Sequence, residues 1–169
     1  SFCRMTRLLM ARPGVVASCP SARHSMYGTR PTSALRCNST SGNPANGTAA
    51  GVLIFSATNN VIDSNVISAG NNGIVFQGGS FGLCLPADAT GNTATCNRIE
   101  NHDTLSYDIG VSSDAAANTV DSNAFQNNAT AVDGTAITSG QLDAENNFWG
   151  AGDGPSGAGP GSGDAVTVN

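Results

Sequence analysis

The chain has 169 residues, 39% of them hydrophobic, and this size and composition fit one domain with a modest core. Residues 51–169 contain one Arg against twelve acids, whereas residues 1–50 contain six Arg and no acid. An acidic body of this kind argues against nucleic acid as a partner. No stretch reaches the roughly 18 apolar residues that a membrane span requires.

Residues 1–50 come first in the chain, and they show no regular alternation of apolar and polar residues. We expect an irregular basic N-terminal segment here, which ends in a polar linker at residues 38–44. The periodic pattern starts at Gly51, so the sequence predicts that residues 51–169 form a repeat domain. Its short alternating apolar pairs are Val52 with Ile54, Ile74 with Phe76, and Ile109 with Val111.

An eight-residue sequence at positions 118–125 recurs in the repeat domain. It places an Asn two residues before an apolar residue, followed by an acid, a small polar residue and a second Asn. Residues 60–67 copy this pattern, residues 97–102 keep its first half, and residues 142–149 keep its second half. The apolar residues predicted to point inward are Ile62, Ile99, Val120 and Ala144. The second-Asn positions predict a ladder of stacked side chains, formed by Asn65, His102, Asn123 and Asn147.

The four inward residues are 37, 21 and 24 positions apart. A period in the low twenties with short strands predicts a solenoid whose coils pair in parallel. We therefore assign an all-β fold, a short right-handed parallel β-helix with an irregular N-terminal segment. The longest interval predicts an excursion between Gly78 and Thr95, and a disulfide between Cys84 and Cys96 would close its base if the protein is exported.

The most specific local sequence is Asn-Asn-Phe-Trp-Gly at residues 146–150, followed by Gly-Pro-Ser-Gly at 154–157 and Gly-Pro-Gly-Ser-Gly-Asp at 159–164. It resembles a segment of secreted and surface right-handed parallel β-helix proteins, the broad pectate-lyase-like superfamily. The resemblance covers residues 51–169 and implies an extracellular or cell-surface location. That superfamily hosts lyases, hydrolases, epimerases, adhesins and viral spikes, so it constrains the function only loosely. Because residues 165–169 look like the start of another strand, we expect a solenoid that is cut short at its C-terminal end.

A column of carboxylates is predicted on the outside of the coils. Asp63, Glu100, Asp121 and Glu145 each follow an inward residue, so side-chain alternation directs them outward and the repeat stacks them. One interpretation is a solvated polar face. The other is a Ca²⁺ site, because this hard cation takes several oxygen ligands.

Two residues are candidates for catalysis. Arg98 is the single cation of the repeat domain, and the resemblance to calcium-dependent lyases implies a base at Arg98 with Asp63, Glu100 and Asp121 as calcium ligands. The simpler interpretation is an ion pair of Arg98 with Glu100 or Asp121. His102 with Asp103 is a candidate general base, since His titrates near neutrality, but a His in an Asn ladder is the simpler interpretation.

Phe148 and Trp149 are candidates for stacking on a sugar, although one of them is expected to fill the core beside Ala144. Asn38, Asn46 and Asn128 lie in glycosylation sequons.

The leading functional prediction is a non-catalytic extracellular or surface module, a scaffold or adhesin that presents polar columns to carbohydrate. The first alternative is a fragment of a calcium-dependent polysaccharide lyase or epimerase that acts on uronate polymers. The second alternative is a filament subunit that associates end to end through open strand edges.

Overall fold

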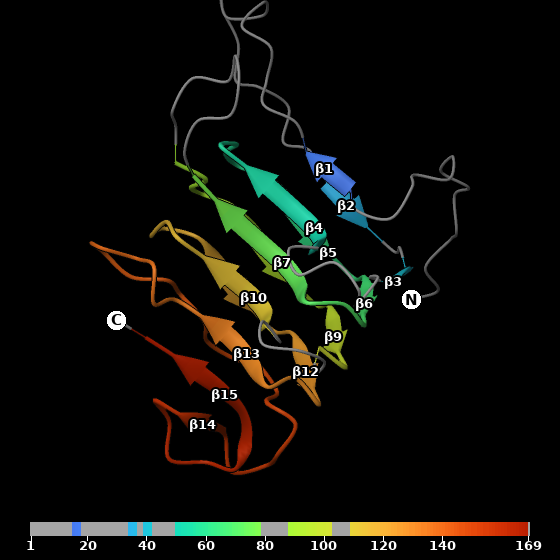
Figure 1. Ribbon diagram of the computed structural model, residues 1–169, viewed down its shortest axis with the longest axis vertical. Helices are drawn as coiled ribbons and strands as arrows, with labels where there is room; N and C mark the ends of the chain where they lie inside the picture. Colours follow the sequence, from blue (N-terminus) through green and yellow to red (C-terminus); the bar gives the residue numbers. More distant parts are fainter. Residues whose placement is uncertain are drawn as a thin grey trace, which may run out of the picture.

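The computed structural model describes residues 50–78, 88–102 and 109–168, together with three short strands nearer the N-terminus, β1 (Val15–Ala17), β2 (Ala34–Arg36) and β3 (Ser39–Ser41). Every regular element among these residues is a β-strand, and the strands form a parallel β-solenoid (Figure 1). The predicted all-β solenoid is therefore confirmed.

Three parallel sheets form the walls of the solenoid. Sheet A has the order β1-β4-β7-β10-β13-β15-β14, sheet B the order β2-β5-β8-β11, and sheet C the order β3-β6-β9-β12. The remaining strands are β4 (Ala50–Phe55), β5 (Val61–Asp63), β6 (Val66–Ser68), β7 (Asn72–Gln77), β8 (Thr93–Thr95), β9 (Arg98–Glu100), β10 (Ile109–Ser113), β11 (Thr119–Asp121), β12 (Ala124–Gln126), β13 (Thr130–Asp133), β14 (Pro155–Gly157) and β15 (Gly163–Thr167). From β1 to β13, consecutive strands lie in sheets A, B and C in turn, so each coil takes one strand from each wall, whereas β14 and β15 both lie in sheet A.

The first coil lies within the N-terminal third of the chain. β1, β2 and β3 pair in parallel with β4, β5 and β6, respectively. Figure 1 shows these three strands at one end of the solenoid and β14 at the other. The boundary predicted at residue 50 therefore does not mark the start of the solenoid, because three strands of the segment expected to be irregular already belong to it.

The core is a narrow column with one set of apolar side chains for each wall. Val52, Ile74, Val111 and Val132 come from sheet A, Ile62, Ala94 and Val120 from sheet B, and Ile67, Ile99 and Phe125 from sheet C, and all of them are buried. In the register of the sheets, Ile99 pairs with Ile67 and Phe125, not with Ile62. The predicted stack of Ile62, Ile99 and Val120 is therefore wrong for Ile99.

Two glycines of sheet A, Gly73 and Gly110, have no room for a side chain. A Cβ atom on Gly73 would lie 2.4 Å from the backbone oxygen of Gly110 and 2.9 Å from Ile99 Cγ2. Neither backbone nor packed aliphatic atoms can give way by that much. Gly73 is therefore required by the close approach of neighbouring coils.

Each described corner between sheets B and C is formed by the same type of two-residue turn. Ser64, Cys96, Ser122 and Asn146 have positive φ values between 53° and 58°, in the left-handed region. Each of them directly precedes an Asn that turns toward the interior of the solenoid. The small polar residue and the second Asn of the sequence repeat thus form the corner between sheets B and C. The left-handed residue turns the chain so that the Asn side chain that follows it points inward.

Candidate functional site

The interior of the corner between sheets B and C is filled by an Asn ladder. Asn65 donates from its backbone N and from Nδ2 to Asn97 Oδ1, at 2.9 Å in both cases. Asn97 repeats both bonds to Asn123, and Asn123 repeats them to Asn147. Each Nδ2 also donates to a backbone oxygen, as Asn97 does to Ile62 O at 2.9 Å. The predicted ladder is correct for Asn65, Asn123 and Asn147, but its missing member is Asn97 and not His102.

Two further ladders line the other corners. Asn60, Asn92 and Asn118 form one between sheets A and B. His102, Asn128 and Asp164 form the other between sheets C and A, where Asn128 donates from N and Nδ2 to Asp164 Oδ2 at 2.8 and 2.7 Å. A carboxylate only accepts hydrogen bonds, so Asp164 suits the last rung of a ladder whose donors all point toward it.

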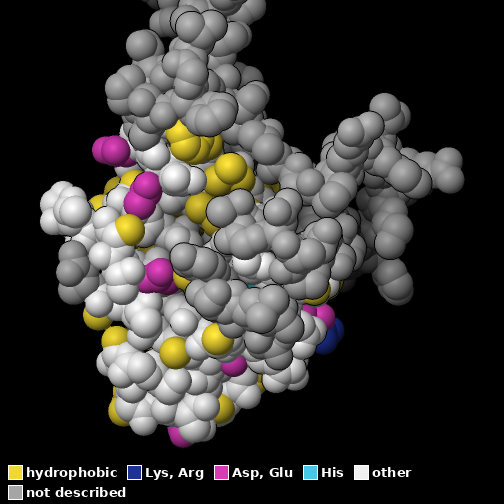
Figure 2. Space-filling view, viewed as in Figure 1, with side chains coloured by type: hydrophobic (Ala, Val, Ile, Leu, Met, Phe, Trp, Pro, Cys, Tyr) yellow, Lys and Arg dark blue, Asp and Glu magenta, His cyan; other side chains and the backbone are white. Residues whose placement is uncertain are grey.

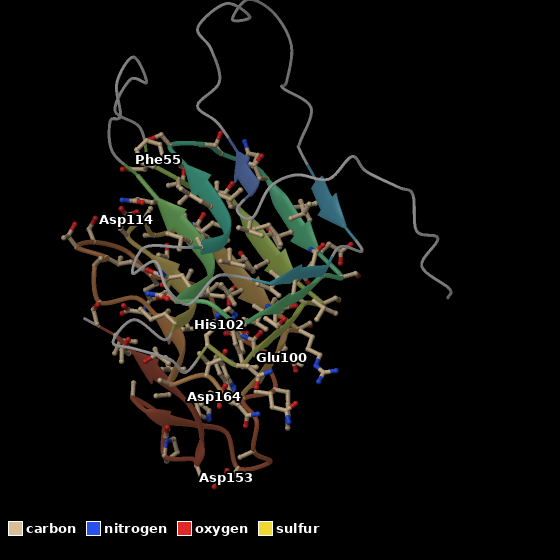
Figure 3. The ribbon with its side chains drawn as sticks, turned by 45° about the vertical axis from the view of Figure 1, so that its right-hand side comes forward. Phe55, Glu100, His102, Asp114, Asp153 and Asp164 are labelled. Atoms are coloured by element: carbon tan, nitrogen blue, oxygen red, sulfur yellow. The ribbon has the colours of Figure 1, made fainter. Side chains whose placement is uncertain are left out.

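His102 lies inside the solenoid and has no exposed surface (Figure 3). Its backbone N donates to Asn128 Oδ1, and its Nδ1 lies 3.1 Å from Gly70 O. Asp103, the partner predicted for a general base, lies outside the described residues. A ring held in this position cannot reach a substrate at the surface, so the ladder role is the one that the geometry supports.

Asn128 also bears on the predicted sequons. Its Nδ2 donates to Ile99 O and to Asp164 Oδ2, and the residue is buried. This amide is therefore inaccessible to glycosylation in the folded protein. Asn38 and Asn46 lie outside the described residues.

The four predicted carboxylates do not form one column. Asp63 pairs in register with Thr95, and Thr95 with Asp121, on the outside of sheet B. Glu145 follows in that column, because the bridge between Thr119 and Asp143 places it beside Asp121. Glu100 instead lies on sheet C, between Ser68 and Gln126. The misplacement has the same cause as that of Ile99, because the segment at residues 97–102 aligns with residues 65–70 and not with residues 60–65.

The carboxylate of Asp121 already has a donor on each oxygen. Asn146 Nδ2 donates to Oδ1 at 2.9 Å and Ser122 Oγ to Oδ2 at 2.8 Å, and these bonds lower the pKa of Asp121. Figure 2 shows the carboxylates scattered over the visible face. Within residues 50–78, 88–102 and 109–168, no three His, Cys, Asp or Glu residues cluster closely enough to hold a metal ion. Calcium binding stays a prediction that these residues do not favour.

A different set of side chains comes together on the outside of sheet C, which we call the sheet C face. One column along the solenoid axis is mainly apolar and includes Val66, Arg98, Ala124 and Phe148. The column beside it is polar and includes Ser68, Glu100 and Gln126. Val66 is 39% exposed and Phe148 is 51% exposed, so both offer apolar surface to solvent on this face.

Arg98 and Glu100 form an ion pair on this face, with 2.6 Å between Arg98 Nε and Glu100 Oε2. The side chain of Arg98 is 59% exposed, whereas His102 is buried inside the solenoid. The two candidate catalytic residues are therefore not brought together, whereas Arg98, Glu100 and Phe148, predicted for three different roles, share one face.

The two aromatic residues predicted to bind sugar point in opposite directions. Trp149 is half-buried and stacks on the ring of Phe125, with 5.3 Å between ring centroids and 8° between ring planes. It continues the sheet C column of the core, as expected for one of the pair. Phe148 is left on the sheet C face.

Sequence reasoning missed Val66, Ala124, Ser68 and Gln126 as members of a site. The signal that would have found them is the Asn that stands directly before each strand of sheet C: Asn65 before β6, Asn97 before β9 and Asn123 before β12. Aligning the chain on this Asn brings the exposed residues of the three strands into register.

The predicted disulfide is not tested. Cys96 is an exposed free thiol at the corner between sheets B and C. Cys84 lies outside the described residues, so its pairing with Cys96 stays a prediction.

The C-terminal end of the solenoid is covered over sheet A, where β15 pairs with β13 and β14 pairs with β15. β14 contains Pro155, which has no N–H to offer a further strand. Over sheets B and C, the last described pairs are the single bridges at Asp143 and Phe148. A hollow of about 490 Å³ opens at this end, and its lining includes Val132, Ile137, Leu142, Ala144 and Val166.

This stepped end bears on the predicted filament. If sheets B and C of a second copy continued those of the first, β1 and β4 of the second copy would extend sheet A beyond β13. These positions are already occupied by β15 and β14 of the first copy. The open edges of sheets B and C alone do not provide for such stacking. End-to-end association stays a prediction that this geometry does not favour.

No family model, no curated protein and no solved structure matches the chain. The parallel β-solenoid therefore rests on the strand pairing, and the superfamily suggested by the Asn-Asn-Phe-Trp-Gly segment stays a resemblance. No helix among the described residues is long and apolar enough to cross a membrane.

Proposed function

We propose that this chain is a non-catalytic carbohydrate-binding module of the cell surface or the extracellular space, and that glycan lies on the sheet C face. The observation that carries the proposal is the pairing of two columns along the solenoid axis. A mainly apolar column, which contains Val66, the ion-paired Arg98 and Phe148, runs beside a polar column that contains Glu100 and Gln126. A sugar also has an apolar and a polar surface, because its ring offers C–H groups on one face and hydroxyl groups around its edge.

The chemistry of each column suits this role. The flat ring of Phe148 offers apolar area with little rotamer freedom to lose. The amide of Gln126 both donates and accepts hydrogen bonds, and the carboxylate of Glu100 accepts them. In the register of sheet C, Ala124 stands between Arg98 and Phe148, so the smallest side chain of the column lies between two longer ones.

The surroundings of the predicted catalytic residues support a binding role over a catalytic one. The guanidinium of Arg98 is held by Glu100, and His102 is buried in a ladder. A lyase would need a free base beside a site for an anionic sugar. Neither group is placed for that task.

The experiment is affinity electrophoresis of the full chain in gels that contain soluble polysaccharides, neutral and uronate types in separate gels. We expect retardation by at least one polysaccharide and its loss in Phe148→Ala. Thr119→Ala, a truncation on the outside of sheet B, should be retarded like the wild type. A parallel assay for ultraviolet-absorbing unsaturated products tests the lyase alternative. Absence of retardation in every gel, or release of such products, would overturn the proposal.

A further inference from the structure

The charges around the sheet C face are uneven and restrict the type of glycan. Arg98 is the single Lys or Arg of residues 51–169, which carry twelve acids. On the face itself its charge is met by Glu100 at 2.6 Å. An anionic sugar chain would therefore meet an acidic body with its one cation already paired, and like charges disfavour binding.

The direction of the two columns restricts how the glycan lies. Val66, Arg98, Ala124 and Phe148 follow one another from coil to coil along the axis. Neighbouring coils are roughly 4.8 Å apart, and a pyranose unit of an extended chain advances that chain by a similar length. A linear glycan along the axis can thus place one sugar ring on each coil.

Resting on the carbohydrate-binding function proposed above, we propose that the ligand is an uncharged, extended glycan chain that lies along the solenoid axis over successive coils. We further assign to Glu100 the role of a specificity-determining residue. By holding the guanidinium of Arg98, Glu100 keeps it from pairing with a uronate carboxylate. Arginine binds carboxylates in a fork geometry, so a freed Arg98 would attract uronates.

The first test is a change of specificity. Wild type and Glu100→Gln are compared on a neutral glucan and a neutral galactomannan, and on polygalacturonate and alginate. The wild type should be retarded by a neutral polymer and not by the uronates. Glu100→Gln should gain retardation on a uronate polymer, by about threefold or more in affinity, because an exposed ion pair is a modest competitor. Its neutral-polymer affinity should change less than its uronate affinity.

The matched control is Glu145→Gln, which removes the same charge from the outside of sheet B. It should leave the uronate affinity unchanged, because no arginine of residues 51–169 lies beside Glu145. Equal gains in both variants would show that general charge repulsion, and not release of Arg98, decides the specificity. That result would overturn the role assigned to Glu100.

The second test measures the length of the ligand. Oligosaccharides of two to six units from a retained neutral polymer are titrated by calorimetry. Affinity should rise with each unit up to about four, the number of coils from Val66 to Phe148. Equal affinity for a disaccharide and a hexasaccharide would overturn the axial chain. Retardation of the wild type by uronates would overturn the uncharged ligand, whereas absence of any retardation would overturn carbohydrate binding itself.

Discussion

The two sides of the corner between sheets B and C use polar residues in opposite ways. On the inside, Asn97 is buried and its side chain makes hydrogen bonds with both neighbouring coils. On the outside of sheet C, Gln126 lies one coil further along and Phe148 two coils further along, and both are exposed. The difference teaches that the many Asn residues, the most conspicuous feature of the sequence, hold the fold together. The proposed binding would then depend on a few outward residues that follow no repeat.

The largest loss of stability is expected for Asn97→Ala, which removes a side chain of the buried ladder. It leaves the backbone N–H of Asn65 without its acceptor and the backbone oxygen of Ile62 without the Asn97 donor, and it removes one of the three acceptors of Asn65 Nδ2. Each unsatisfied buried group costs about 1–3 kcal/mol, so we expect the free energy of unfolding to fall by about 3 kcal/mol or more. Urea unfolding measures this loss. Gln126→Ala on the outside is the control and should stay within about 0.5 kcal/mol of the wild type.

The adjacent residues Phe148 and Trp149 separate the two sides at one position of the chain, the bridge to Ala124. Trp149→Ala removes the ring that stacks on Phe125 and should destabilise the fold by about 2 kcal/mol, less than for a fully buried ring. Phe148→Ala should change the free energy of unfolding by less than about 0.5 kcal/mol. Thermal unfolding of the two variants side by side checks this. Equal destabilisation would mean that Phe148 is part of the core and not of a binding face.

A smaller effect is expected at the end of the ladder between sheets C and A. Asp164→Asn keeps an oxygen for the two donors of Asn128 but loses the charge, so a loss of about 1 kcal/mol is expected. Asp164→Ala removes the acceptor altogether and should cost about 2 kcal/mol. Chemical unfolding of both variants gives the order. A ladder that needs no terminal acceptor would show no difference between them.

The smallest effect is a dependence of stability on acid. Burial alone would raise the pKa of Asp133, but hydrogen bonds from Thr135 and Thr167 outweigh it and lower the pKa below its usual value of 3.8. A lowered pKa in the folded state means that this stabilisation is present above the unfolded-state value. It is lost as the pH falls through the folded-state value.

The melting temperature should therefore fall more steeply below about pH 4 in the wild type than in Asp133→Asn, whose side chain does not titrate. Thr167→Val removes one of the hydrogen bonds and should move the acid transition to a higher pH. Identical acid profiles for the wild type and Asp133→Asn would contradict the assignment.

The solenoid could be predicted because its coils reuse one corner device. Asn65 and Asn123 occupy equivalent corners, and the sequence around each is nearly the same, so the repeat was visible. The register of the strands was harder to predict. An Asn corner occurs at all three edges of a coil, so similar Asn sequences recur within a coil as well as from one coil to the next. Stacked ladder members are in fact 32, 26 and 24 positions apart. For this reason the repeat aligns Asn97 with Asn60, one corner before its true equivalent Asn65. The predicted positions of Ile99, Glu100 and His102 are wrong by the same shift.

The site was predictable only in part. The sequence predicts Phe148 as a sugar-stacking aromatic residue and Arg98 as the single cation of the repeat domain, but nothing local shows that they share a face. Their proximity comes from the pairing of strands far apart in the sequence. The strands β1, β2 and β3 escaped prediction because the repeat is altered around them: Arg36 stands where the next coil has Asp63, and Thr40 where it has Ile67.

The central proposal is that the apolar and polar columns of the sheet C face bind one ligand together. A double-mutant cycle measures this by calorimetry with a retained neutral oligosaccharide, using Phe148→Ala, Gln126→Ala and their combination. Coupling of at least about 0.5 kcal/mol is predicted for this pair, against simple additivity when Thr119→Ala on sheet B replaces Gln126→Ala. Unchanged affinity in Phe148→Ala, or additive losses in both cycles, would contradict it.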